Sequence, residues 1–106
     1  MSEITKLYEN AGVEYLMYVV DTFPPVEYPQ INFTAEKQLF LFQWVCKKFD
    51  EIYISYTDFE EVQSWEIVYK ISVHRNSFEE CLCAFVNLFW QDLTEEEKQQ
   101  VKGILE

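Results

Sequence analysis

The chain has 106 residues, of which 49% are hydrophobic and 18% aromatic, and its formal net charge at pH 7 is −11. This apolar content excludes a disordered acidic tail, because such tails lack the large side chains that form a core. The length fits one domain spanning residues 1–106, and the shortage of basic residues argues against direct contact with nucleic-acid phosphates or anionic membranes.

The first third of the chain predicts one helix and an ambiguous stretch. Apolar residues recur at helical spacing over residues 4–11, with Ser2 as N-cap and Gly12 as the C-terminal stop. Residues 13–22 fit either a continued helix or a buried strand, because periodicity does not separate the two at this length. Residues 24–30 contain three prolines and predict an extended connector.

A second helix is predicted to begin after the N-cap Thr34, with Glu36 in its first turn. Its apolar face is wide, so we expect this helix to be central to the core. That face consists of one stripe with Leu39, Phe42, Cys46 and Phe49 and an adjoining stripe with Phe40 and Trp44.

The middle of the chain predicts an antiparallel hairpin. Residues 52–56 and residues 65–74 alternate with the period of two that is typical of strands, and the acidic segment 57–61 lies between them. His74 falls on the polar face of the second strand. We interpret it as a solvated histidine rather than a catalytic base, because no partner is in reach by pattern.

The last third predicts two helices that meet at a corner, residues 91–93. Residues 77–80 and residues 94–97 each have the capping-box pattern, in which Ser or Thr is followed three positions later by Glu. The predicted fold is therefore a small α+β domain, with a hairpin or small sheet packed against three to four helices in the order α-α-β-β-α-α. The apolar face of the first of these helices consists of Phe78, Cys81, Leu82, Phe85, Leu88 and Phe89.

The three cysteines, Cys46, Cys81 and Cys83, predict reduced thiols. Their odd number does not suit a disulfide framework, and on a helix Cys81 and Cys83 would point about 200° apart, too far to share one ion. No phosphate loop, nucleophile elbow or metal motif is present, so we expect neither a metal, a cofactor nor an enzyme. The chain also has no signal-peptide pattern, and its longest apolar run has six residues, which predicts a soluble cytoplasmic protein.

Three segments carry a resemblance: KLYENAGVE (6–14), FTAEKQLFLFQWV (33–45) and FEECLCAFVNLFWQDLTEEEKQQVKGIL (78–105). They resemble small acidic proteins from phages and prophages of Gram-positive bacteria, which generally carry no assigned function. The resemblance covers about half of the chain and is most recognisable at the corner from Trp90 to Glu97. It implies an accessory phage gene product and carries over no catalytic or ligand residue.

The tract between residues 50 and 66 holds six acids and no Lys or Arg. We expect this tract to bind a basic host protein, as in an anti-CRISPR or other anti-defence protein that mimics nucleic acid and blocks DNA or guide binding by an effector nuclease. The alternative is a non-catalytic phage scaffold or regulatory protein that acts as a homodimer through exposed aromatics. The predicted contact residues are the acids Asp50, Glu51, Asp58, Glu60, Glu61 and Glu66 and the aromatics Tyr53, Tyr56, Phe59 and Trp65.

Overall fold

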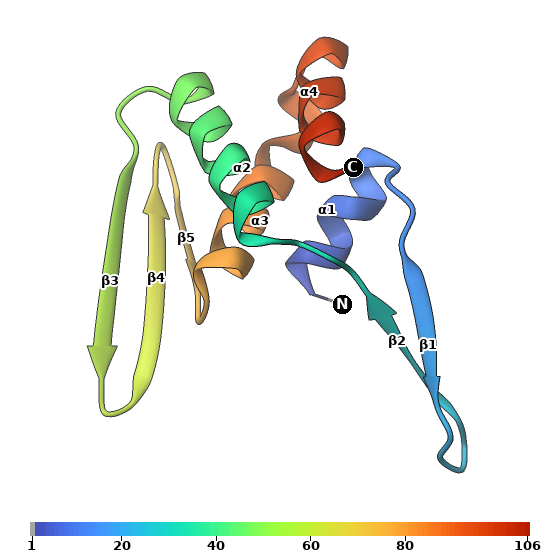
Figure 1. Cartoon of the computed structure of the whole chain (residues 1–106). Coiled ribbons are helices and arrows are strands. Elements are labelled where there is room, and N and C mark those ends of the chain that lie inside the picture. The colour runs from blue at the N-terminus through green and yellow to red at the C-terminus, as the bar shows by residue number, and fades with distance from the viewer. Residues whose placement is uncertain (1) are drawn as a thin grey trace.

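The computed structural model describes residues 2–106, which form four α-helices, a short 3-10 helix and five strands (Figure 1). The strands make two antiparallel sheets, one of β1 and β2 and one of β3, β4 and β5 in that order. The predicted α+β class is confirmed, although two more strands precede α2 and a third extends the predicted hairpin. The elements are α1 (Glu3–Ala11), β1 (Leu16–Val20), β2 (Val26–Gln30), α2 (Ala35–Lys48), β3 (Tyr53–Phe59), β4 (Val62–Val68), β5 (Ser72–Arg75), α3 (Phe78–Phe89), η1 (Trp90–Asp92) and α4 (Glu95–Leu105).

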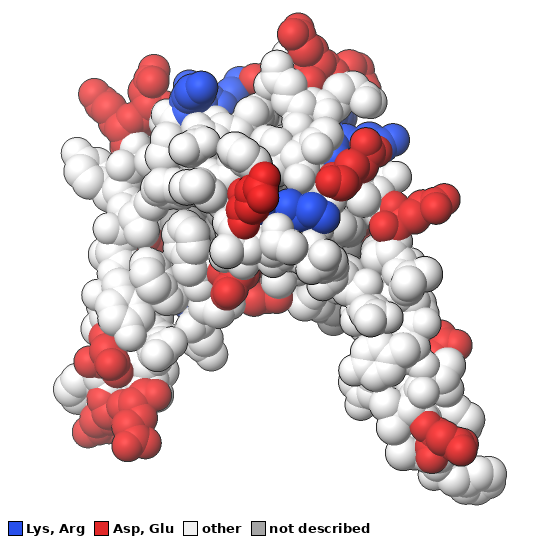
Figure 2. Space-filling view, in the orientation of Figure 1, with Lys and Arg blue, Asp and Glu red and all other residues white. Residues whose placement is uncertain are grey.

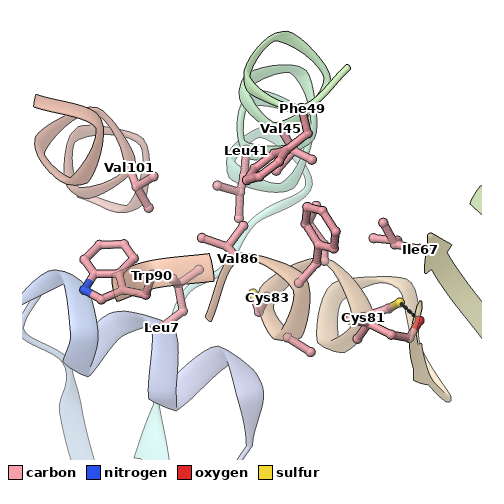
Figure 3. Packing of buried hydrophobic residues seen from close by; sticks show 14 of the residues in the cluster. Leu7, Leu41, Val45, Phe49, Ile67, Cys81, Cys83, Val86, Trp90 and Val101 are labelled. Atoms are coloured by element: carbon pink, nitrogen blue, oxygen red, sulfur yellow. Dashed lines mark hydrogen bonds between the residues drawn. The ribbon is translucent and has the colours of Figure 1, made fainter. Parts of the chain in front are cut away.

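Helix α3 occupies the centre of the core. Its residues 81–86 are all buried, so the helix contacts other elements on nearly every side. Figure 3 shows Leu7 of α1, Leu41 of α2 and Ile67 of β4 directed toward α3 from different sides. The central position therefore belongs to α3 and not, as predicted, to the helix that follows Thr34.

The predicted helix ends of α1 and α2 are confirmed by their caps. The Ser2 hydroxyl accepts a hydrogen bond from the Thr5 N–H, and Gly12 closes α1 in the left-handed conformation at φ 71°. Thr34 caps α2 by accepting from the Lys37 N–H at 3.2 Å. These interactions satisfy backbone groups that the helix itself leaves free.

The predicted apolar face of α2 is correct at Phe42, Trp44 and Phe49, which are buried or half-buried against the core, and wrong at its other three positions. Leu41 and Val45 are the residues that α2 buries, while Leu39, Phe40 and Cys46 are exposed. Apolar residues surround this helix too widely for spacing alone to select the inner face. Phe49, which ends the helix, is buried as predicted, and its ring packs against Phe85 and Phe89 with centroids 5.0 and 5.1 Å apart.

Residues 16–30 form an antiparallel hairpin, so the helix alternative for residues 13–22 is wrong, and the predicted extended segment 24–30 is extended as the second strand of this hairpin. β1 pairs with β2 from Leu16↔Gln30 to Val20↔Val26, and Pro29 lies within β2. Proline fits there because an edge strand needs no N–H donor on its outer side. The strand alternative for residues 13–22 is confirmed by β1, but this strand is not buried, because every residue of β1 is exposed.

The predicted hairpin in the middle of the chain is present but differs at both strands. β3 continues through Phe59, two residues beyond the start of the acidic segment. The predicted strand 65–74 is divided: β4 ends at Val68, residues 69–71 form a turn, and β5 follows. The turn lacks Gly and Pro, so the alternating pattern continues through it without a visible break.

The two predicted capping boxes have different outcomes. At α4 the box is complete, because Thr94 and Glu97 each accept a hydrogen bond from the other's backbone N–H. At α3 only the Ser77 half forms, and the Glu80 carboxylate instead accepts from the Glu3 N–H at 2.8 Å. Glu80 thus joins the first turn of α1 to the first turn of α3.

Two hairpins project from the helical body (Figure 1). We call residues 16–30 the apolar arm and residues 53–68 the acidic arm. The radius of gyration is 15.0 Å, whereas a compact domain of this length has about 12.9 Å. No helix within residues 2–106 is long and apolar enough to cross a membrane.

Candidate protein-binding surface

The basic residues of the chain are confined to the body, whereas acidic residues lie on both the body and the arms. All eight Lys and Arg residues lie outside the two arms, whereas the acidic arm holds Asp58, Glu60, Glu61 and Glu66. In Figure 2 red acidic atoms lie on both arms and on the body, while the blue atoms lie on the body alone. No cation on the acidic arm itself neutralises its end, so the field there is negative.

The end of the acidic arm is a tight turn made by Glu60 and Glu61. Their φ angles are 49° and 65°, and they connect the paired residues Phe59 and Val62. Two-residue turns of this handedness normally use Asn and Gly, because other residues lose about 1–2 kcal/mol each in the left-handed region. The chain therefore places two carboxylates at its outermost turn against local backbone preference, which is the kind of strain found at functional positions.

The predicted contact residues do not form one continuous cluster. Asp50 and Glu51 lie where α2 meets β3, at the opposite end of the strand from Glu60 and Glu61. Six residues, five of them in β3, lie between Glu51 and Asp58, so the two acidic groups are about 20 Å apart along the arm. A partner that contacts both groups would have to lie along the whole arm.

The predicted aromatic residues lie on different faces of the arm. Tyr56 packs on its cross-strand neighbour Trp65 with ring centroids 4.7 Å apart, and Trp65 packs on Phe78 of α3. Tyr53 and Phe59 have the opposite strand parity, so they lie on the outer face, where Phe59 is 68% exposed. Tyr53 and Phe59 are therefore free for a partner, whereas Trp65 is engaged in packing.

Glu66 is held by two neighbours. Its carboxylate is 2.9 Å from His74 Nε2 and accepts a hydrogen bond from the Ser55 hydroxyl at 3.1 Å. The three side chains lie side by side on the outer face of β3, β4 and β5. The linear pattern of residues does not show the partners of Glu66, because these contacts depend on cross-strand register.

The apolar arm was also missed as a candidate surface. Its Asp21 and Phe23 lie at the turn between β1 and β2, where Phe23 is fully exposed. The sequence carries one signal for this surface, a long tract without basic residues. Residues 7–36 contain no Lys or Arg, just as residues 50–66 do not.

The cysteines have the surroundings of structural thiols. Burial raises the pKa of Cys81 and of Cys83, which favours the protonated form of both. The Cys81 thiol donates toward the carbonyl oxygens of Trp65 and Val73 at 3.5 Å. Cys46 is exposed and free, and within residues 2–106 no three metal-binding side chains come together.

In comparisons with known proteins, no protein-family model, curated protein or solved structure matches the chain.

Proposed function

We propose that this protein binds a basic protein partner through the acidic arm. The observation that carries the proposal is the turn at Glu60 and Glu61, where a projecting hairpin places carboxylates at positive φ with no cation on the arm. A surface that served only solubility would not need strained glutamates at its outermost point.

The arm combines charge with apolar contact area. Arginine side chains bind carboxylates through paired, charge-assisted hydrogen bonds, and removal of water strengthens these contacts. Phe59 and Val62 pair directly beside the charged turn and are both exposed, so they can supply the apolar contacts that anchor an interface. Glu60, Glu61 and Asp58 would then stand where phosphates stand in a nucleic-acid ligand.

The partner class that fits this surface is a nuclease with a cationic nucleic-acid channel. Effector nucleases of bacterial defence hold a heteroduplex in such a channel through backbone contacts. Together with the resemblance to phage proteins, this leads us to propose an anti-defence protein of the anti-CRISPR type, which acts in the cytoplasm of the infected bacterial cell and blocks DNA or guide binding.

A matched pair of variants tests the role of the acidic turn. Glu60→Gln/Glu61→Gln removes two charges from the arm, and the control Glu95→Gln/Glu96→Gln removes two exposed charges from the body. The probe is a purified CRISPR effector nuclease of a Gram-positive host, with binding measured by calorimetry at about 50 and 300 mM salt. We expect the arm variant to raise Kd about tenfold or more and the control to leave it within about twofold.

The proposal also requires that wild-type binding weakens at the higher salt concentration. A Kd that stays the same at both salt concentrations and in Glu60→Gln/Glu61→Gln would show that the acidic arm does not make the contact. So would an equal loss of affinity in the arm variant and the body control.

The alternative function, a homodimeric phage scaffold or regulatory protein, is favoured by a different observation. The apolar arm exposes Leu16, Tyr18 and Val19 without an acidic or basic residue in β1. A stable dimer that retains no basic protein would support this alternative.

A further inference from the structure

The chain exposes more surface than a monomer of its size should. Its solvent-accessible surface is 7203 Å², whereas a folded 12.8 kDa monomer has about 6,300 Å². The excess of about 900 Å² matches one side of a standard protein interface, which buries about 800 Å² on each partner. The two arms account for this surplus, since both hairpins project into solvent (Figure 1).

No other part of the described chain, residues 2–106, covers the apolar residues of the apolar arm. Every residue of β1 and β2 is exposed. One face carries Leu16, Tyr18 and Val20 and the other carries Met17 and Val19, so no orientation of the arm hides its apolar residues. A two-stranded hairpin alone in water is marginally stable, which predicts that another surface covers this one.

Of the four sheet edges within residues 2–106, only β1 lacks protection against pairing. β2 carries Pro29 and Glu27, β3 carries Asp58, and β5 carries His74 and Arg75. Proline and charge on an edge are the devices that prevent strand addition.

β1 reads LMYVV, with no charge, no proline and no glycine. It also runs along the outer side of its arm in Figure 1. A second copy can therefore approach β1 without placing like charges of the two strands opposite each other, even though each chain has a net charge of −11.

The position of Pro29 shows which backbone groups of β1 are free. Pro29 is opposite Met17 and has no N–H, so this pair is not a hydrogen-bonded pair of the ladder. Hydrogen-bonded and non-hydrogen-bonded pairs alternate, which places Val19↔Glu27 in the same class as Met17↔Pro29. The N–H and C=O groups of Met17 and Val19 therefore point away from β2, toward the free edge.

From this geometry we propose that two copies of the chain form a dimer by antiparallel pairing of β1 with β1. The two-fold axis passes beside Tyr18, and Met17 of each copy exchanges hydrogen bonds with Val19 of the other. The result is a four-stranded sheet in the order β2-β1-β1-β2 with about four new backbone hydrogen bonds. The acidic arms remain outside this contact, so the dimer does not depend on the proposed nuclease binding.

The same register gives the exposed Phe23 a place. Antiparallel pairing centred on Tyr18 carries the turn of one arm alongside residues 13–15 of the other copy. Val13 and Leu16 line a surface cavity of about 580 Å³ there, together with Leu105. Phe23→Ala is therefore expected to weaken the dimer.

Sedimentation equilibrium of the full chain tests the dimer with two matched proline variants. Val19→Pro removes an N–H from the free edge of β1, while Glu27→Pro removes one from the outer edge of β2 at the same rung of the hairpin. We expect the wild type and Glu27→Pro to have a molecular mass of about twice 12.8 kDa, and Val19→Pro to have the mass of a monomer.

Cysteine cross-linking tests the register independently of strand stability. In a Cys46→Ser background, Tyr18→Cys places two thiols at a non-hydrogen-bonded pair across the axis, within disulfide distance. Val20→Cys, on the same face, would be about 13 Å from its copy. We expect oxidation to cross-link the first variant and not the second.

Three results would overturn the proposed dimer. One is a wild type that stays monomeric at about 100 µM, a concentration above the Kd of a standard interface. In that case the apolar arm would have to bind a different protein. The others are a dimer that Val19→Pro leaves intact, and cross-linking that is no greater at position 18 than at position 20.

Discussion

Replacing Phe85 by alanine should destabilise the protein far more than the same change at Phe59. Phe85 is fully buried in α3, and its ring lies 5.0 Å from the centroids of both Phe49 and Phe89. Removal of such a ring costs about 3–5 kcal/mol, a large part of the roughly 5–15 kcal/mol that stabilises a typical domain. Phe59 is 68% exposed at the end of the acidic arm, so Phe59→Ala should change the free energy of unfolding by about 0.5 kcal/mol or less.

Thermal unfolding followed by far-ultraviolet circular dichroism measures both variants. For a chain of this length, 1 kcal/mol corresponds to about 4 °C in Tm, so Phe85→Ala should lower Tm by roughly 12–20 °C. Phe59→Ala should stay within about 2 °C of the wild type. Equal losses in the two variants would refute the separation of a packed body from exposed arms, and with it the availability of Phe59 to a partner.

Further predictions concern pH, thiols and glycines. The hydrogen bond from Lys48 lowers the pKa of Glu97. The Glu97 carboxylate therefore stabilises the fold above its unfolded pKa of about 4.3, and this contribution is lost as pH falls through the lower pKa of the folded state. In urea unfolding, Glu97→Gln should lose less free energy of unfolding between neutral and acidic pH than the wild type does. A thiol reagent should modify Cys46 in the native protein and reach the two buried cysteines only after unfolding; equal reaction of all three would place α3 at the surface. Gly12→Ala should destabilise by about 1 kcal/mol because φ is 71°, whereas Gly103→Ala, inside α4 with open space at the Cβ position, should stabilise by about 0.5–1 kcal/mol; chemical denaturation would contradict the backbone assignment if both changes had the same sign.

Local signals predicted the helix ends well. Ser2, Gly12, Thr34 and Thr94 each act within three to five residues of the chain, and the structure confirms all four caps. Such interactions depend on short-range geometry that the order of residues fixes. The same reasoning failed for Glu80, whose carboxylate reaches α1 instead of its own cap, because that contact joins residues far apart in sequence.

Features that depend on tertiary context were not predictable. Leu39 and Leu41 are equally apolar, and only the placement of α3 decides that Leu41 is buried and Leu39 exposed. The break between β4 and β5 has no Gly or Pro to mark it. The run of acids was visible in the sequence, but the division of that run between two ends of β3, and the pairing of Glu66 with His74, follow from strand register.

Displacement of nucleic acid from a nuclease tests the proposed role of the acidic arm most directly. A labelled target DNA bound to a guide-loaded CRISPR effector of a Gram-positive host gives a fluorescence anisotropy signal that falls when the channel is occupied by a competitor. The wild-type chain and Glu95→Gln/Glu96→Gln should release the DNA at similar concentrations, and Glu60→Gln/Glu61→Gln should need about tenfold more. Unchanged anisotropy with all three proteins, or equal release by all three, would contradict a channel-binding acidic arm.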